Sequence, residues 1–322
     1  FAIGILTLLL KSGKISLNDL GVFLKQPSRA LLCVLIIFGN YLISFYRWRT
    51  MVGGLSLKLK YTAAVRLGML GQFFSSVIPG TVGGDLVKAV YVAKRFPEKK
   101  VAAVSTIFLD RVVGLLGMVL LSGTAYFFGR HLVAAGNGNL IHLIQALGTT
   151  LMLGAITIVV FFLALTIWGS KFPNHLPKKY SESFWYKKVE PLYEIIVAYK
   201  KRPMILWRVL LLSVFIHIVN MACFWIIANT IYGPSPWGSV SVSTFVLSGI
   251  LGLIAMAIPV APMGLGVGQV AFSAIFLALG APSAAFGTSI VTVQQLVSLC
   301  VNLSGAVFFA TYKQEIPQPS LV

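Results

Sequence analysis

The chain has 322 residues, of which 57% are hydrophobic and only 11% are charged, and its mean hydropathy is +0.89. Soluble domains carry roughly 25% charged residues, so this composition excludes an ordinary water-soluble globule. The 26 basic residues outnumber the 8 acidic ones, but they lie in blocks between long apolar runs, which is typical of membrane proteins and not of nucleic-acid binding.

Five apolar runs are long enough to cross a bilayer, which takes about 20 residues. In chain order they are Ala30–Tyr46, Val101–Phe128, Leu140–Trp168, Ile205–Ile231 and Ala285–Tyr312. We interpret the shorter run Phe1–Leu10 as part of a further span. The sequence therefore predicts an all-α polytopic membrane protein with about six spanning helices.

Two more apolar stretches, residues 63–86 and 240–279, are interrupted by proline and glycine. The breaks fall at residues 78–84 and 258–268. Irregular backbone is not tolerated where it faces lipid, so each break is expected to be buried in protein or to line a wet cavity.

Blocks of basic residues fix the expected topology. Residues 47–66, 86–100 and 169–208 are rich in lysine and arginine, whereas the loops near 129–139, 232–239 and 280–284 contain one base in total. The basic blocks are therefore predicted to be cytoplasmic. Because the basic blocks before and after the first broken stretch lie on the same side of the membrane, that stretch must enter the membrane and return to the side from which it came. By the same argument the second broken stretch is a re-entrant hairpin from the opposite side.

A weak internal repeat accompanies these hairpins. Asp85 lies 25 residues before Asp110, and Gln269 lies 25 residues before Gln294. We predict one transmembrane domain over residues 1–322, containing an inverted-topology repeat of residues 30–128 and 205–312; chance similarity is the alternative. The connector at 171–203 is predicted to be a basic amphipathic helix on the inner leaflet, or a solvated linker.

Ionisable residues inside apolar helices are expensive and mark functional sites. Four of them follow the first break, and we predict that they form a binding site with the residues of the break itself. Lysine, arginine and a helix start suit a phosphate, and the carboxylates suit an ammonium group, a proton or a metal ion. The alternative is an ion-pair network that only fixes helix packing. The predicted substrate-binding residues are Pro79, Gly83, Gly84, Asp85, Lys88, Asp110 and Arg111.

The second half carries neutral amides instead. Gln269, Gln294 and Gln295 are predicted to bind headgroup oxygens, or else to join helices as ordinary packing contacts. His217 and Asn220 could face the same cavity, and a structural, hydrogen-bonded role is favoured for His217. The three cysteines lie apart in apolar runs, so no disulfide, metal site or cofactor is predicted.

Four motifs, taken in order, resemble the membrane region of the lysylphosphatidylglycerol synthase/flippase-like family. They are Tyr46-Arg47-Trp48-Arg49, residues 71–89, residues 109–115 and residues 259–269. The resemblance implies a helical bundle with two opposed re-entrant hairpins that translocates lipids with charged headgroups. It also implies that Asp110-Arg111 and Asp85 with Lys88 are its site residues. The chain departs from the family pattern at Gly268-Gln269, where Arg-Glu is usual, and at Gln295, where an arginine is usual. The soluble aminoacyl-transferase domain of the synthase is not expected in this chain.

The predicted function is transport of a phospholipid or lipid-linked phosphate across the cytoplasmic membrane. The expected partners are anionic or aminoacylated phospholipids or polyprenyl-phosphate, with a second copy, a synthase or a glycosyltransferase as protein partners, and no nucleic acid. The alternatives are a membrane enzyme acting on a polyprenyl-phosphate, with Asp85 and Asp110 as metal ligands or base, and a non-transporting partner of a glycosyltransferase.

Overall fold

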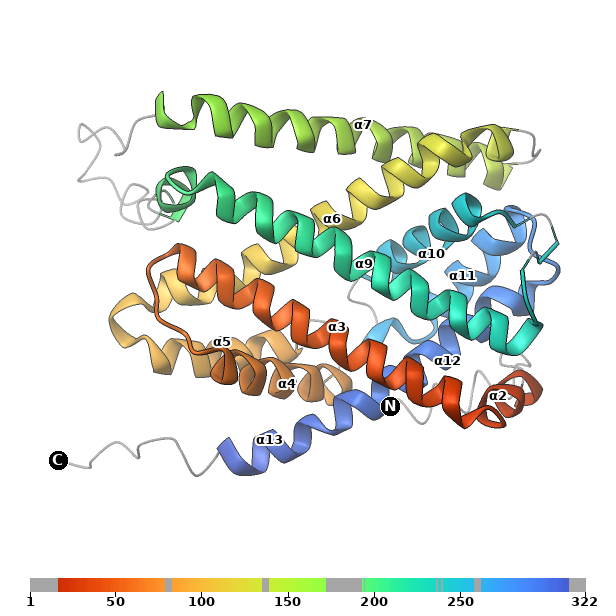
Figure 1. Ribbon diagram of the computed structural model, residues 1–322, viewed down its shortest axis with the longest axis horizontal. Coiled ribbons are helices and arrows are strands. Elements are labelled where there is room, and N and C mark those ends of the chain that lie inside the picture. Colours follow the sequence, from red (N-terminus) through yellow and green to blue (C-terminus); the bar gives the residue numbers. More distant parts are fainter. Residues whose placement is uncertain are drawn as a thin grey trace.

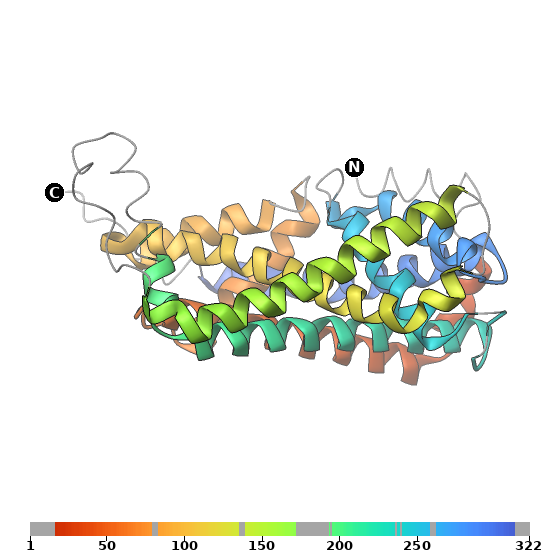
Figure 2. The same cartoon turned by 90° about the horizontal axis from the view of Figure 1, so that it is seen from above.

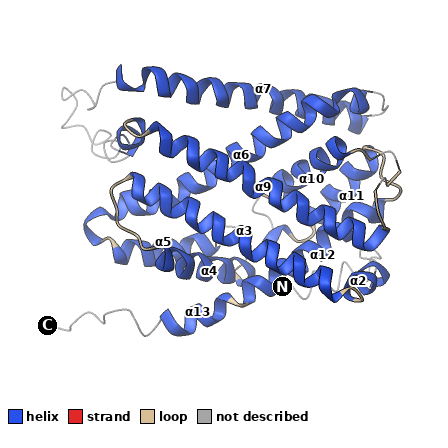
Figure 3. Ribbon diagram, in the orientation of Figure 1, coloured by secondary structure: helices blue, strands red, loops and turns tan. Residues whose placement is uncertain are grey.

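Helices make up nearly all of the structure, a computed structural model that describes residues 17–78, 83–134, 139–171, 193, 195–235, 237–238, 240–257 and 262–312. Within these ranges β-pairing is limited to an isolated bridge between Trp237 and Val240, and Figure 3 shows helices and loops. The predicted all-α architecture is confirmed. The run Phe1–Leu10, Pro79 and residues 172–192 of the predicted connector lie outside the described residues.

In the described part of the chain five helices are long and apolar enough to cross a membrane, and each overlaps one of the five runs predicted from the sequence. They are α3 (Pro27–Gly54), α6 (Lys100–Ala134), α7 (Asn139–Trp168), α9 (Pro203–Tyr232) and α12 (Ala284–Leu303). The chain is therefore a multi-pass membrane protein. Both α3 and α9 begin with a proline at the first turn, where the missing N–H costs nothing.

Shorter helices fill the two broken stretches. The first stretch forms α4 (Tyr61–Val77) and α5 (Gly83–Arg95), and the second forms α10 (Val242–Met256) and α11 (Val267–Ala278). The remaining elements are α2 (Leu17–Leu24), α13 (Gly305–Tyr312) and the short turns η1 (Pro97–Lys99), η2 (Gly169–Lys171) and η4 (Pro262–Gly264).

The two pairs of short helices occupy opposite ends of the molecule. In Figure 1, α4 and α5 lie toward the left end of the long helices, and α10 and α11 lie toward the right end. Figure 2 shows that α3 and α9 run side by side along one face and that both pairs of short helices lie on the other. A cluster of aromatic rings, including Phe224, Phe245 and Phe286, fills the core between α9, α10 and α12.

The helix ends that carry the basic blocks meet at one end of the molecule. The ends of α3, α5 and α7 and the starts of α4, α6 and α9 all lie at the left of Figure 1. This grouping agrees with the charge argument, while the side of a membrane on which this end lies stays a prediction.

One helix boundary corrects the sequence analysis. The first described span was expected to end at Tyr46, but α3 continues to Gly54 because Met51 and Val52 still have a core to pack against and the first helix-breaking residues are Gly53 and Gly54. Arg47, counted there among the cytoplasmic bases, is therefore inside the helix and 6% exposed.

The described end of the connector packs on this same helix. Residues 195–200 are helical, and the Tyr199 hydroxyl donates to the Met51 carbonyl at 2.7 Å. The Arg202 guanidinium donates to the carbonyls of Gly53 and Gly54, the last two residues of α3.

Candidate functional site

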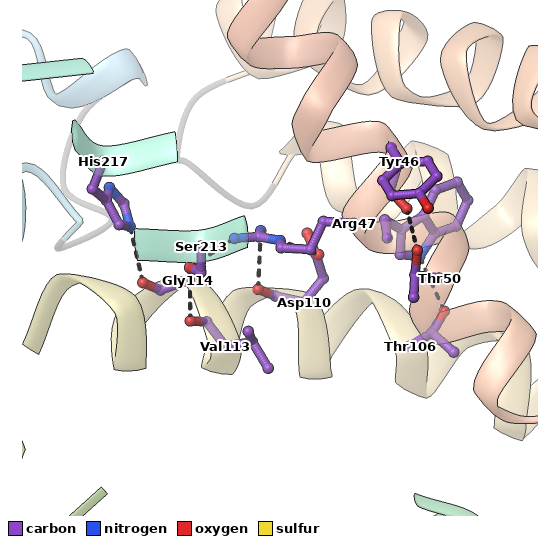
Figure 4. Close-up of polar contacts among 10 residues, drawn as sticks. Tyr46, Arg47, Thr50, Thr106, Asp110, Val113, Gly114, Ser213 and His217 are labelled. Atoms are coloured by element: carbon purple, nitrogen blue, oxygen red, sulfur yellow. Dashed lines mark hydrogen bonds and ion pairs between the residues drawn. The ribbon is translucent and has the colours of Figure 1, made fainter. Parts of the chain in front are cut away.

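A buried ion pair joins α3 to α6. Arg47 Nε donates to Asp110 Oδ1 at 3.0 Å, and the two side chains are 7% and 15% exposed. A second guanidinium nitrogen of Arg47 donates to Ser213 Oγ of α9 at 2.9 Å (Figure 4). The arginine therefore ties three spanning helices together at one point.

Two further contacts continue along α6 and α9 from this point. Ser213 Oγ donates to the Val113 carbonyl at 2.9 Å, and His217 Nε2 lies 3.0 Å from the Gly114 carbonyl (Figure 4). His217 is 6% exposed, and its Nδ1 has no hydrogen-bond partner among the described residues. The histidine thus packs between two spans, as its structural reading expected.

The second ion pair is exposed. Arg111 Nε donates to Asp85 Oδ2 at 2.6 Å and connects α6 with the first turn of α5. The Arg111 side chain is 54% exposed and that of Asp85 is 22% exposed. Since Arg111 follows Asp110 directly, the two arginine–aspartate pairs lie on neighbouring faces of α6, one facing the bundle and one facing outward.

Lys88 lies one turn after Asp85 and points into the bundle, where it is 7% exposed. Its ammonium group sits 3.6 Å from the centroid of the Trp48 ring. The ring is held in turn by a hydrogen bond of 3.1 Å from Trp48 Nε1 to Thr106 Oγ1. Asp110 and Asp85 both lie close enough to attract the Lys88 charge. Lysine therefore completes a group of five charged side chains drawn from α3, α5 and α6: Arg47, Asp85, Lys88, Asp110 and Arg111.

Glycine allows the start of α5 to approach α4 closely. A side chain at Gly84 would collide with the Gly71 carbonyl and the Ser75 hydroxyl, and one at Gly83 would meet Ile78 at 2.6 Å. Because the two glycines have no side chains, the start of α5 can lie directly against α4. This close approach places Asp85 beside α6.

The second break is held by amides. Gln269 Nε2 donates to Gln295 Oε1 at 2.7 Å and to Thr292 Oγ1 at 3.2 Å, while its Oε1 accepts from the Gly266 amide at 2.7 Å. Gln295 Nε2 donates to the Met263 carbonyl at 3.1 Å. These contacts join the start of α11 to α12 and to η4.

The structure divides the described site residues between the charged group at the first break and the Gln269–Gln295 contact at the second, and leaves Gln294 outside both. The Asp85, Lys88, Asp110 and Arg111 side chains gather as expected, and each aspartate pairs with an arginine from another helix. Gln294, by contrast, donates to Ser298 Oγ one turn along α12 and takes no part in the Gln269–Gln295 contact.

Sequence reasoning missed Arg47, Trp48 and Ser213 as members of this group. A signal was present for the first two, because the apolar pattern continues through Met51 and Val52 before the glycines at 53 and 54. No comparable signal marks Ser213, which is one of many serines in apolar runs.

The charged group offers two basic side chains of different character. Arg111 presents an exposed guanidinium whose planar N–H groups match phosphate oxygens, and Lys88 presents a point charge next to an aromatic ring. The first turn of α5 adds backbone N–H groups that have no partner within the helix. Together these groups can bind an anion, which competes with the Asp85 carboxylate for the Arg111 guanidinium.

Comparisons with known proteins place the chain in a family of membrane proteins. Residues 1–305 match the family described as "Lysylphosphatidylglycerol synthase TM region". The chain is also similar to UPF0104 membrane protein PH1989 of Pyrococcus horikoshii, with 22% identity over 303 residues that cover 84% of this chain and 83% of that protein. No solved structure matches the chain.

Proposed function

Because the chain belongs to the family of the lysylphosphatidylglycerol synthase transmembrane region, we propose that it is a lipid transporter that moves lipids with a phosphate-containing headgroup across the membrane. The cargo is a phospholipid, anionic or aminoacylated, or a lipid-linked phosphate. We place it as a multi-pass protein in the cytoplasmic membrane, with the end that carries the basic blocks on the cytoplasmic side.

The observation that carries this proposal is the exposed Arg111–Asp85 pair, whose arginine belongs to the spanning helix α6. Eleven residues separate Lys100, where α6 begins, from Arg111, which corresponds to about 16 Å of helix at 1.5 Å per residue. The apolar span itself covers Pro97–His131, so Arg111 lies well inside it. A charged side chain at such depth is costly unless polar groups surround it. An outward-facing Arg111–Asp85 pair therefore requires a hydrated or headgroup-filled path beside α6.

The neighbouring residues suit a phosphate in that path. Arg111 and Lys88 supply positive charge from two helices, and the first turn of α5, which also carries Asp85, supplies backbone N–H groups. The acyl chains would stay in the bilayer, since many of the outward-facing side chains of the spans, such as Leu115 and Phe108 on α6, are apolar and exposed. In this scheme the headgroup crosses along the protein and the tails follow in lipid.

The placement of the short helices supports a transport cycle. We take α4–α5 and α10–α11 to be re-entrant hairpins that enter from opposite sides, within two related halves of one transmembrane domain. Discontinuous helices at matching places in two halves are typical of secondary transporters, where rocking of one half against the other exposes a central site alternately to each side.

Reconstitution tests the proposal. Purified protein in liposomes is expected to move fluorescent phosphatidylglycerol between leaflets, measured by the fraction that dithionite quenches from outside. Arg111→Ala and Lys88→Met are expected to lower the rate at least tenfold, because each removes one anion ligand. Arg130→Ala is the matched control, since it removes an arginine from the same helix near its far end, where it stacks on Phe127.

Two outcomes contradict the proposal. The first is wild-type protein that moves no anionic, aminoacylated or zwitterionic phospholipid and no polyprenyl-phosphate in this assay. The second is equal transport by Arg111→Ala and Arg130→Ala, because the charge at depth would then be irrelevant to the movement.

A further inference from the structure

The same arrangement recurs in both halves of the chain: a short helix, a break, and a second short helix whose second residue is glycine and whose third residue is polar. In the first half Gly84 and Asp85 are the second and third residues of α5, and in the second half Gly268 and Gln269 are the second and third residues of α11. Each glycine packs against the preceding short helix, Gly84 on the Gly71 carbonyl of α4 and Gly268 on Met256 of α10.

The polar residue then makes the same contact in each half. Asp85 accepts from Arg111, which is 26 residues later on α6, at 2.6 Å. Gln269 donates to Gln295, which is also 26 residues later on α12, at 2.7 Å. Both contacts join the third residue of the second short helix to the long helix that follows it.

The packing around the two contacts is paired as well. Helix α6 of the first half packs against α10 of the second half. The equivalent contact with the halves interchanged is also present, since α12 and α13 pack against α4. Helices α3 and α9, which precede the two broken stretches, pack against each other. These pairings are those of a two-fold relation between the halves.

We infer that Gln269–Gln295 is the uncharged counterpart of the Asp85–Arg111 ion pair, and that the protein therefore binds its anion in the first half only. This inference rests on the proposed function for its statement about the anion, and on the contacts alone for the equivalence of the two pairs.

The difference between the pairs is chemical. A phosphate oxygen competes with the Asp85 carboxylate for the same guanidinium, so an anion can open the first pair. The amide pair has no charge to attract an anion, and each of its side-chain nitrogen and oxygen atoms has a partner within the protein, at 1% exposure for Gln269 and 3% for Gln295. The second pair thus keeps α11 on α12 while the first one exchanges Asp85 for the headgroup.

A transplant tests the equivalence without any transport assay. Gln295→Arg alone buries a cation without a counter-charge and is expected to lower the melting temperature in detergent by on the order of 5 °C or more. Adding Gln269→Asp copies the pair of the first half and is expected to restore most of that loss. The matched control is Gln294→Arg, with and without Gln269→Asp, because Gln294 is adjacent but contacts Ser298 instead.

Rescue of Gln294→Arg to the same extent as Gln295→Arg, or no rescue of either, overturns the equivalence. Rescue of Gln295→Arg alone supports it, whether or not the protein proves to transport lipid.

The assignment of the anion to the first half is tested by a separate measurement. Short-chain phosphatidylglycerol is expected to raise the melting temperature of the wild type and of the Gln269→Asp/Gln295→Arg variant, and to leave Asp85→Gln/Arg111→Gln unchanged. A wild type that this lipid does not stabilise, or a doubly neutralised variant that it stabilises equally, overturns the assignment of the anion to the first half.

Discussion

Two arginines that face different surroundings show how burial decides what a charge does in this protein. Arg47 is 7% exposed in its side chain, pairs with Asp110 and reaches Ser213, so these two contacts fix the positions of three spans. Arg111 is 54% exposed and has Asp85 on the adjoining helix. The first arrangement is that of a structural contact, and the second leaves a cation within reach of a ligand.

The buried pair leads to a prediction about stability. Arg47→Ala leaves Asp110 without its counter-charge inside the bundle, and removing one partner of a buried pair costs about 3–5 kcal/mol. Arg111→Ala, at an exposed pair, is expected to cost about 0–1 kcal/mol. The measurement is the unfolding midpoint of each purified variant in mixed detergent micelles.

The double variant Arg47→Ala/Asp110→Ala serves as the control. It is expected to be more stable than Arg47→Ala alone, because no buried charge remains unpaired. A single Arg47→Ala variant as stable as the wild type would show that Arg47 is not the contact on which the three helices depend.

The limits of sequence reasoning are clearest at these residues. Successive helix positions point about 100° apart, so Asp110 and Arg111 face different ways, and each pairs with a residue of another helix. The partner of Asp110 lies 63 residues earlier, and only the packing of α3 on α6 reveals it. Likewise Gln294 and Gln295 are identical in the sequence, yet the register of α12 against α11 turns only Gln295 toward the break.

At the scale of the element, the sequence predicted where helices lie better than where they end. All five spans were found from their apolar runs, since length and hydropathy depend on the residues of one segment alone. The end of α3 was placed too early because a basic residue was taken as the membrane boundary, whereas its burial depends on α6 and α9.

The close approach of α4 and α5 gives a prediction at this scale. Gly84→Ala puts a methyl group into the Gly71 carbonyl and the Ser75 hydroxyl, so α5 must move away from α4. We expect a loss of stability of about 1–3 kcal/mol, the usual cost of overpacking, together with slower lipid movement because Asp85 and Lys88 move with α5. The measurements are the unfolding midpoint and the dithionite assay on the same preparation.

Gly39→Ala is the control for this substitution. Gly39 lies within α3 and has nothing within 4 Å of the position that its side chain would take. Alanine there is expected to be neutral or stabilising by about 0.5–1 kcal/mol, because it favours the helix. Equal behaviour of the two variants would contradict the argument that backbone contact positions α5.

At the scale of the whole molecule, charge and shape point to one orientation. The basic blocks lie at the end where α3, α5 and α7 finish, and the two pairs of short helices reach toward the interior from opposite ends (Figure 1). If both pairs are re-entrant, the loops that flank each pair lie on one side of the membrane. That consequence is independent of any lipid movement.

Single-cysteine labelling measures on which side of the membrane these flanking loops lie. In a background in which Cys33, Cys223 and Cys300 are replaced by alanine, cysteines are introduced in four exposed turns, two flanking each broken stretch. The positions are Ser56, Lys99, Ser235 and Ser283. A membrane-impermeant maleimide is expected to label Ser235→Cys and Ser283→Cys in intact cells, and Ser56→Cys and Lys99→Cys only after permeabilisation. Positive-inside reasoning sets this direction, because the basic residues gather around Ser56 and Lys99. Labelling of Ser56→Cys and Lys99→Cys from opposite sides would make α4–α5 a full crossing and would remove the basis for two opposed hairpins.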